Sequence, residues 1–411
     1  MNAALNSTEF SQDPYPVLAA LRERGPVQRI RTGNGRTTWV VTGWAAAREA
    51  LADGRLSKDT ARYFADRPST RNLAPAVSRT MLATDPPDHG RLRRLAMAAF
   101  TPAAVARLEP RIREIAEGLA DALAAGLATH GVVDLVEDFA VPLPIAVISE
   151  LLGVPERERA AVRRWSNTLF AEGDPAGRAP SRPEEDPDAV VDRASHDLSD
   201  YMTGLIAARR LAPGEDVLSG LIAARDEEDR LTEPELVSLA VLLVVAGHET
   251  TANLIGNGML ALLLDDALRA RLRDDPSLLP GAVEEFLRYD APVTVATFRY
   301  ATEPMELGGA RIGPGDVVLV SPGAANRDPV QFPAPDAVRL DRPGGHLSFG
   351  HGPHRCLGAT LARLEGRIAF EVLLTRLPEL RRTEEGTDGL VWRRTRLMRG
   401  LAGLPVTSAS L

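Results

Sequence analysis

Apolar residues are spaced as in an α-helix over most of the chain between residues 88 and 289. They recur three and four positions apart, which places them on one face of a helix. The pattern predicts helices over 88–99, 102–126, 142–153, 156–171, 188–211, 266–273 and 280–289, and shorter ones over 13–24 and 44–51. We therefore expect a mainly α-helical protein.

Short β-strands are predicted near both ends of the chain. Residues 27–30 and 37–42 flank Gly33-Asn34-Gly35, which is a hairpin signal. Further strand-like runs are 295–300, 305–307, 310–312 and 317–320, and the tail 397–406 has strand and turn character. Since no linker separates two cores, we expect a single domain over 1–411, mainly α (α+β), with a small β-rich lobe.

The longest apolar stretch begins at the capping-box pattern Thr232-Glu233-Pro234-Glu235. From there apolar residues occupy nearly every helical face as far as Leu264, about 33 residues or roughly 50 Å of helix. A helix that is apolar all round has to be buried, so we expect it to run through the middle of the protein. Its most apolar run, 236–247, is too short to span a bilayer unaided.

Polar residues interrupt this helix over 246–251, which reads Ala-Gly-His-Glu-Thr-Thr. In one interpretation the threonines bond back to carbonyls of their own helix, or the face touches solvent. In the other, Gly247 weakens the helical ladder beside Glu249 and Thr250, which favours a local bulge that holds water. The residues alone leave both interpretations open.

Composition and net charge indicate which kinds of protein this chain can be. The chain has 411 residues, with 44% apolar and 25% charged residues, as in an ordinary globular protein. A net charge of −8 disfavours general nucleic-acid binding. The polar N-terminus predicts neither a secretory signal nor a membrane anchor. The single cysteine excludes an internal disulfide and fits a cytoplasmic protein.

That cysteine, Cys356, lies in a glycine-rich loop. Residues 349–358 read Phe-Gly-His-Gly-Pro-His-Arg-Cys-Leu-Gly, so the backbone can pass close to something large and flat. A helical pattern follows, which places Cys356 at or just before a helix N-terminus, where N–H groups and the helix dipole favour a thiolate. One thiolate, shielded by Phe349, is what a haem iron needs as its axial ligand.

Two other interpretations of Cys356 compete with haem ligation. A lone cysteine is most often a small buried apolar residue. Together with His346, His351 and His354 it also suggests zinc. Structural zinc sites usually draw on two separated ligand pairs, and the absence of a second cysteine argues against one here.

The loop resembles the haem-binding loop of the cytochrome P-450 superfamily, in its soluble bacterial form. The motif over 246–251 and the Glu285-x-x-Arg288 motif occur in the order and spacing of the same family, and the likeness runs from 13–15 to 404–406. It is closest to actinobacterial members. The resemblance implies the fold of that family, with haem b (iron protoporphyrin IX) between the long central helix and the cysteine loop.

The resemblance also implies roles for individual residues. Cys356 would be the axial ligand of the haem iron, Thr250 would hold the reacting dioxygen, and Glu249 would help to relay protons. Phe349, Gly358 and Ala246 are further expected haem contacts, and His89, Arg93, Arg299 and His354 are expected to meet the haem propionates.

Glu285 and Arg288 carry opposite charges at positions i and i+3 of one predicted helix. On a surface such a pair contributes a few tenths of a kcal/mol. The resemblance makes it a buried structural pair behind the cysteine loop. The family's usual third member, an arginine, is expected where Ala337 and Val338 stand, and Arg339 lies two residues later, so only the pair is predicted.

The resemblance implies insertion of one atom of O2 into a C–H or C=C bond. Electrons would come from a separate ferredoxin and an NAD(P)H-dependent reductase, and an acidic ferredoxin is expected to dock on Arg91, Arg94, Arg355 and Arg363. The expected substrate is a medium-to-large, mostly apolar molecule such as a macrolide, other secondary metabolite or sterol-like compound. A cytoplasmic monomer that binds neither nucleic acid nor a membrane is expected.

The substrate itself is expected to contact four segments of the chain. These are 57–82, 169–190, 293–297 and 397–398. The candidate contact residues are Leu242, Val245, Val293, Val295, Thr297, Leu397 and Met398.

Other functions fit parts of the sequence. A haem-based gas sensor would not need the Glu249–Thr250 pair and usually carries an output domain, and a helical interaction protein would bind no haem. A peroxide-driven enzyme is a rival within catalysis, although its relatives tend to lack the acid–alcohol pair.

Overall fold

The computed structural model describes the chain except for residues 1–4, 6, 32–36, 67–70, 171–185, 225–230, 385, 388, 396 and 409–411. The turn Gly33-Asn34-Gly35 and most of the loop expected over 174–187 lie outside the described residues. Contacts along the chain group the residues into two compact units. The first unit comprises Met1–Leu56, Arg107–Leu143 and Thr250–Leu411, and the second comprises Ser57–Ala106 and Pro144–Glu249.

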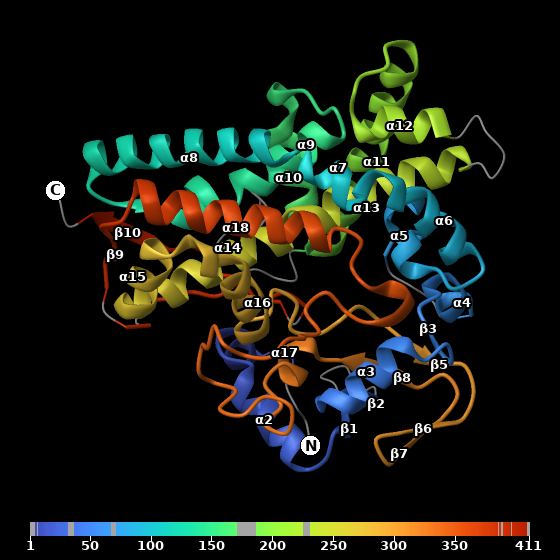
Figure 1. Cartoon of the computed structure of the whole chain (residues 1–411). Helices are drawn as coiled ribbons and strands as arrows, with labels where there is room; N and C mark the ends of the chain where they lie inside the picture. Colours follow the sequence, from blue (N-terminus) through green and yellow to red (C-terminus); the bar gives the residue numbers. More distant parts are fainter. Residues whose placement is uncertain are drawn as a thin grey trace. The chain divides into compact units, whose positions relative to one another are not determined.

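The first unit contains a five-stranded sheet in the order β1-β2-β8-β5-β3 (Figure 1). β1 and β2 are antiparallel, β2 and β8 parallel, and β5 pairs with β8. The strands are β1 (Val27–Arg31), β2 (Thr37–Val41), β3 (Leu56–Ser57), β5 (Tyr300–Ala301) and β8 (Val317–Val320). The strand expected over 295–300 is thus mostly extended chain, tied to β8 by the bonds Ala296 N–H to Val320 O and Val318 N–H to Arg299 O.

Alternation along β2 and β8 sorts their side chains onto the two faces of the sheet. Val41, Val318 and Val320 pack with α3 (Trp44–Ala52) in one apolar cluster. Val40 and Leu319 pack in another cluster with residues of α1 (Thr8–Gln12) and α2 (Tyr15–Glu23). Because side chains of a strand alternate with period two, these short strands are covered on both faces.

Helices form the rest of the first unit. They are α8 (Glu109–His130), α14 (Glu249–Leu264), α15 (Asp266–Asp274), α16 (Leu279–Tyr289), α17 (Pro322–Ala325) and α18 (Ala359–Arg376), with α9 (Pro142–Leu151) at the unit boundary. Figure 1 shows α8 and α18 side by side, and these two helices are in contact. A Cβ on Gly258 of α14 would lie 2.4 Å from Phe370 Cζ of α18, so glycine permits the close packing of these two helices.

Smaller elements complete this unit. A π-helical turn covers Val136–Ala140, and 3₁₀ turns cover Pro276–Leu278 and Gly352–His354. A three-stranded sheet joins β4 (Val133–Asp134), β10 (Pro405–Ser408) and β9 (Leu380–Arg382), and β6 (Met305–Leu307) pairs with β7 (Ala310–Ile312).

The second unit is helical. Its longer helices are α6 (Asp88–Met97), α10 (Glu156–Phe170), α11 (Pro187–Leu211), α12 (Val217–Ala224) and α13 (Glu233–Gly247). Its shorter helices are α4 (Thr60–Phe64), α5 (Pro75–Ser78) and α7 (Pro102–Ala106). Two 3₁₀ turns cover Met81–Ala83 and Ala98–Phe100. α13 packs against α5, α10 and α11. The mainly α-helical prediction is confirmed.

Two predicted elements differ in detail. The helix expected over 102–126 is divided into α7 and α8, because Pro110 lies in the first turn of α8 and a proline disfavours helix before it. The irregular segment 57–80 contains α4, capped by Asp59, and α5, which begins at Pro75.

The long apolar helix forms as predicted, from the Thr232 capping box to Leu264, with a break at His248. By length and composition Glu233–Leu264 could cross a membrane, but 78% of its most apolar window is buried within the protein. Its apolar surface is therefore covered by the protein itself.

Candidate active site

The loop that carries Cys356 is shaped by glycines with positive φ. Gly350 and Gly352 have φ of 70° and 71°. A Cβ on Gly352 would lie 2.8 Å from Leu51 O, so this position also requires glycine because of its close contact with α3. The Cys356 N–H donates to Phe349 O at 2.7 Å, which closes the loop. The Cys356 side chain is exposed, two residues before Gly358, the N-cap of α18.

Phe349 is held by two basic side chains. The Arg363 guanidinium lies 4.4 Å from the centre of its ring, and the His346 ring centre is 5.5 Å away. Both bases also bind Glu284: Arg363 Nε at 2.6 Å and His346 Nε2 at 3.2 Å. Burial raises the pKa of Glu284, but these hydrogen bonds outweigh it and lower the pKa to about 2. Phe349 thus has a fixed place at the start of the loop.

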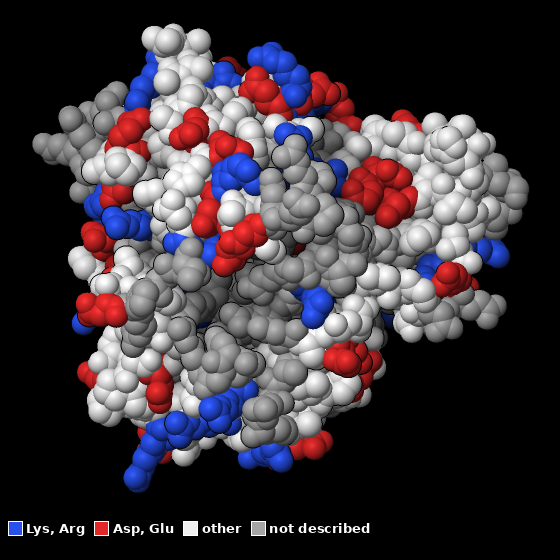
Figure 2. Space-filling model, turned by 180° about the vertical axis from the view of Figure 1, so that it is seen from behind, with Lys and Arg blue, Asp and Glu red and all other residues white. Residues whose placement is uncertain are grey.

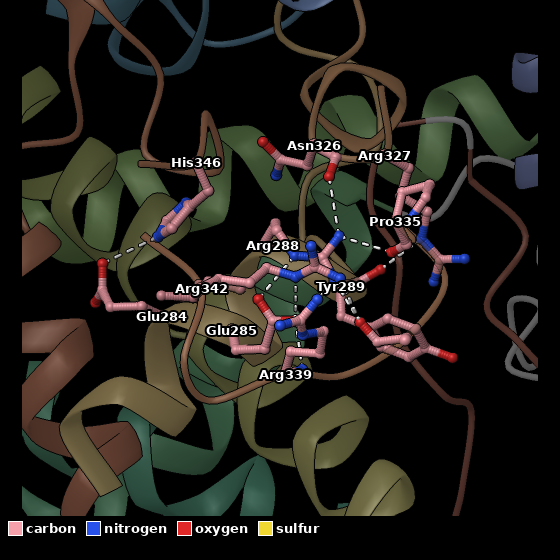
Figure 3. Close-up of polar contacts among 12 residues, drawn as sticks. Glu284, Glu285, Arg288, Tyr289, Asn326, Arg327, Pro335, Arg339, Arg342 and His346 are labelled. Atoms are coloured by element: carbon pink, nitrogen blue, oxygen red, sulfur yellow. Dashed lines mark hydrogen bonds and ion pairs between the residues drawn. The ribbon is translucent and has the colours of Figure 1, made fainter. Parts of the chain in front are cut away.

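Glu285 and Arg288 form a buried ion pair on α16 (Figure 3). Arg288 Nε and Nη2 donate to the two oxygens of Glu285 at 2.7 and 2.8 Å, and the two side chains are 4% or less exposed. Arg288 also donates to the carbonyls of Asn326, Pro335 and Ala337 at 2.8 to 3.1 Å. These bonds occupy the guanidinium fully, which is what a buried charge requires.

Asn326 connects this pair to the cysteine loop. Its carbonyl accepts from Arg288, its side-chain oxygen accepts from the Leu347 N–H at 2.7 Å, and its amide donates to Ser348 Oγ at 2.8 Å. Residue 349 follows directly and closes the loop through Cys356. The pair therefore stabilises the backbone that enters the loop.

The third member of the network is Arg342, which the sequence did not single out. Its Nε donates to Glu285 at 3.0 Å, and its side chain is 9% exposed (Figure 3). Arg339 contributes only its backbone N–H to Glu285, at 2.8 Å, while its side chain pairs with Asp341 at the surface. The sequence offers both arginines in one proline-rich stretch, and only the path of the loop distinguishes them.

The break in the long helix opens one stripe of its surface. Between residues 236 and 260 every residue is buried except Leu242, Val245, Ala246, Gly247 and Thr250. Their spacing of three and four residues puts them on one helical face. Glu249 and Thr251, on either side of Thr250, are each 3% exposed. Thr250, rather than Thr251, is the hydroxyl on the open stripe.

His248 fills the break itself. Its ring nitrogens lie 2.9 Å from Val244 O and 3.0 Å from Asn167 Oδ1. A Cβ on Gly247 would lie 3.2 Å from Ile148, so this turn is closely packed in the second unit. The helix is interrupted here, between α13 and α14, which agrees with the interpretation that Gly247 weakens the helical ladder.

Basic residues expected at the propionates are placed in both units. In the second unit His89 is 3% exposed, and burial lowers its pKa, as do the charges of Arg93 and Lys58, against the opposing charge of Asp85. In the first unit Arg299 is 4% exposed and donates to Thr297 O at 3.1 Å. His354 lies in the 3₁₀ turn before Cys356.

Two of the segments expected at the substrate pair with each other. Val293 bridges Met398, and the Thr294 N–H donates to Leu397 O at 2.9 Å. Val293 and Leu397 are partly exposed, whereas Met398 is buried. Val295 is 1% exposed and packs in the cluster with Phe10 and Leu18, so its place in the core is explained without a ligand.

The predicted basic docking patch is partly neutralised. Arg91 forms an ion pair with Glu235, and Arg363 forms one with Glu284. On the face drawn in Figure 2, acidic and basic side chains are interspersed. Arg355, in the cysteine loop, is exposed.

These residues fit a haem group. Haem needs one protein thiolate and cations for its carboxylates, and in the first unit the cysteine loop supplies the sulfur and the buried Arg299 supplies a cation. Among the residues that the structure describes, no group of three or more His, Cys, Asp or Glu lies close enough to hold a metal ion by itself.

Comparison with known proteins decides the family. The family model "Cytochrome P450" matches residues 188–380. The cytochrome P450 monooxygenase PikC of Streptomyces venezuelae is 46% identical, covering 97% of this chain and 92% of PikC. The 6-deoxyerythronolide B hydroxylase of Saccharopolyspora erythraea is 41% identical, covering 98% of each chain.

This chain belongs to the cytochrome P450 family. The solved structure of the tirandamycin C-bound P450 monooxygenase TamI superposes with a TM-score of 0.86, at 43% identity over 98% of this chain and 99% of TamI. The predicted fold class is therefore confirmed. This cytochrome P450 is a monooxygenase, an oxidoreductase that uses haem and dioxygen, receives electrons from redox partners and acts on small molecules.

Proposed function

We propose that this cytochrome P450 inserts one atom of O2 into a C–H or C=C bond of a macrolide or related polyketide. Its relatives include a hydroxylase of 6-deoxyerythronolide B and a monooxygenase that binds tirandamycin C, which supports this substrate class. Other secondary metabolites and sterol-like compounds are the alternative substrate classes. The protein works as a cytoplasmic monomer, with electrons from NAD(P)H through a ferredoxin reductase and a ferredoxin.

The open stripe of the central helix is the observation that carries this proposal. It combines apolar side chains, at Leu242, Val245 and Ala246, with one hydroxyl, at Thr250. Apolar contacts suit a large apolar substrate, and a hydroxyl beside the buried Glu249 suits controlled delivery of protons.

The proposed haem is haem b, with Cys356 as its axial ligand. Arg299 and His354, and in the other unit His89 and Arg93, neutralise the propionates, while Phe349, Gly358 and Ala246 contact the ring. When bound, haem supplies the reductive activation of dioxygen, and a thiolate ligand favours cleavage of the O–O bond. The Glu284–Arg363–Phe349 contacts and the Glu285 network keep the Cys356 loop in position.

Thr250 and Glu249 perform the proton chemistry in this proposal. The Thr250 hydroxyl holds a proton donor at the open stripe, and Glu249 passes protons to it from the buried side. The His248 side chain occupies the break between the two helix segments, directly before this pair in the first turn of α14.

The proposed substrate contacts are the partly exposed residues among the candidates. They are Leu242, Val245, Val293, Thr297 and Leu397. Met398 supports Leu397 from within the protein, and Val295 is assigned to the core instead. For the ferredoxin, the exposed Arg355 is the proposed contact, and reduction should slow as salt rises.

The reduced, carbon-monoxide-bound spectrum tests thiolate ligation. We expect a strongly red-shifted Soret band in the wild-type protein and its loss in Cys356→His, together with all monooxygenase product. A Cys356→His protein that keeps both the band and the product would contradict the ligand assignment.

The substrate class is tested separately, with the wild-type enzyme, a ferredoxin and its reductase. The compounds are 6-deoxyerythronolide B, tirandamycin C and cholesterol, each scored for oxygenated product by mass spectrometry. Product from cholesterol alone would overturn the polyketide assignment.

A further inference from the structure

A hairpin near the C-terminus carries Leu397, and its base is fixed by one arginine. Trp392 bridges Leu401, the Arg393 N–H donates to Gly400 O at 2.9 Å, and the Ala402 N–H donates to Val391 O at 2.8 Å. On its other side the hairpin pairs with the segment that holds Val293, through the bonds Thr294 N–H to Leu397 O and Arg399 N–H to Pro292 O. The hairpin therefore determines how residues 397–398 lie against residues 293–294.

Arg399 stacks on Trp392 within this hairpin and joins the hairpin to two other parts of the first unit. Its guanidinium lies 3.3 Å from the centre of the Trp392 ring, across the hairpin. Nη1 donates to Ser11 O at 3.1 Å and to Gln12 O at 2.8 Å, at the end of α1. Nε donates to Asp290 Oδ1 at 3.2 Å, at the C-cap of α16.

The partners of Arg399 are themselves fixed. Asp290 Oδ1 also accepts from the Tyr15 hydroxyl at 2.6 Å, and the Gln12 side chain bonds the main chain of Trp392 at 3.2 and 3.3 Å. The Asn257 amide of α14 donates to Arg399 O at 3.0 Å. Arg399 is 7% exposed, so its planar fork is held in one arrangement.

We propose that Arg399 is a specificity-determining positioning residue, which fixes residues 397–398 against residues 293–294 and thereby limits which bulky ligands fit. The inference rests on the proposed function, since it takes Leu397 and Val293 as ligand contacts. Arg399 touches neither ligand nor haem in this proposal, and it acts through the hairpin. Arg399→Lys keeps the positive charge but loses the stacking on Trp392 and the several hydrogen bonds of the planar guanidinium. The base of the hairpin therefore loosens.

Arg327 offers a matched control in the same cluster. Its guanidinium lies 3.5 Å from the Tyr15 ring centre and 4.3 Å from that of Tyr289, and its Nε donates to Tyr289 O at 2.8 Å. It is mostly covered and lies near the same tyrosine, with 12% of its side chain exposed, but its described bonds reach Tyr289 and Asp336 and not the hairpin. Arg327→Lys should therefore reduce stability like Arg399→Lys and leave the hairpin in place.

The test uses two imidazole ligands of different bulk on the holoenzyme. Imidazole can ligate iron without reaching the hairpin, whereas clotrimazole places a triphenylmethyl group in the substrate space. We expect Arg399→Lys to weaken clotrimazole binding at least fivefold in spectral titrations and to change the Kd of imidazole less than twofold. Leu397→Ala should give the same selective change, and Arg327→Lys should change both affinities less than twofold.

Hydrogen exchange gives a readout that is independent of ligands. The amides of Thr294 and Arg399 should exchange at least tenfold faster in Arg399→Lys and at the wild-type rate in Arg327→Lys. If Arg399→Lys does not fold, Gln12→Ala loosens the same hairpin base more gently and should weaken clotrimazole at least twofold.

Three outcomes would overturn the inference. They are equal changes for both imidazoles in the loosened variant, no change for either, or the same selective change in Arg327→Lys. If the wild-type protein shows no spectral shift with either imidazole, the proposed haem function fails instead.

Discussion

Two regions of this cytochrome P450 bury charged side chains, and the groups around these side chains differ in bonding and exposure. In the network behind the cysteine loop, Glu285 receives bonds from Arg288, Arg342 and the Arg339 N–H. At the break of the central helix, Glu249 is just as buried, but its neighbour Thr250 faces the open stripe. A network whose polar groups all bond to one another can only stabilise the fold. A polar group that is partly exposed can also take part in a reaction.

Removing Arg288 should break the closed network. Arg288→Ala leaves the buried Glu285 with fewer donors, and loss of one partner of a buried ion pair costs about 3–5 kcal/mol. Urea unfolding measures the loss. Arg339→Ala is the control, since its side chain pairs at the surface, and it should stay within about 0.5 kcal/mol of wild type. Equal stability of the two variants would mean that the network is not what holds this region.

A second prediction concerns the buried Glu365 of α18. Burial raises its pKa to about 8, so the folded protein keeps a proton that the unfolded chain releases near pH 4.5. The free energy of unfolding of the wild-type protein should then decrease as the pH rises between these two values, by up to about 1.4 kcal/mol per pH unit. Glu365→Gln removes this slope, and the advantage of the variant should grow from pH 5 to pH 8.

Urea midpoints at four pH values check the Glu365 prediction. Exposed Glu379→Gln should follow the wild-type curve. If Glu365→Gln also follows that curve, the carboxyl does not retain its proton on folding.

A substitution of Arg342 tests whether the network extends beyond the pair of Glu285 and Arg288. Besides Glu285 it donates to the carbonyls of Pro333, Ala334 and Ala337 at 2.5 to 3.0 Å. Lysine cannot reproduce this fork, so Arg342→Lys should lower the free energy of unfolding by about 1.5–3 kcal/mol, the contribution of hydrogen bonds to charged groups. Arg339→Lys should be near neutral. A loss in Arg342→Lys no larger than in that control would reduce the network to Glu285 and Arg288.

Thr250→Ala should have the smallest effect on stability and a large one on chemistry. We expect a loss of about 1 kcal/mol or less, because one hydroxyl is removed from a partly exposed position. Oxygen and NAD(P)H would still be consumed, but hydrogen peroxide would replace oxygenated product. The ratio of product to NAD(P)H oxidised, with peroxide counted, measures this change.

Thr251→Ala is the matched control for Thr250→Ala. Thr251 is 3% exposed and off the open stripe, so its removal should preserve the product ratio. The same ratio in both variants would return Thr250 to a structural role.

The sequence by itself determined the long buried helix, its polar break and the cysteine loop. Each depends on neighbours along the chain: a capping box at Thr232, apolarity on every face, and glycines around Cys356. Local rules suffice there, because a helix apolar all round has only the interior to occupy. The helix over 102–126 shows the limit, since one proline at position 110 divides it.

Only the tertiary structure decided the contacts between distant residues. Arg399 reaches Gln12 across 387 positions and Asp290 across 109, and no local pattern marks such a contact. The choice of Arg342 over Arg339 depends on the path of a loop. Burial and hydrogen bonding of a side chain are set by the packing of whole elements, which the spacing of residues in the sequence does not contain.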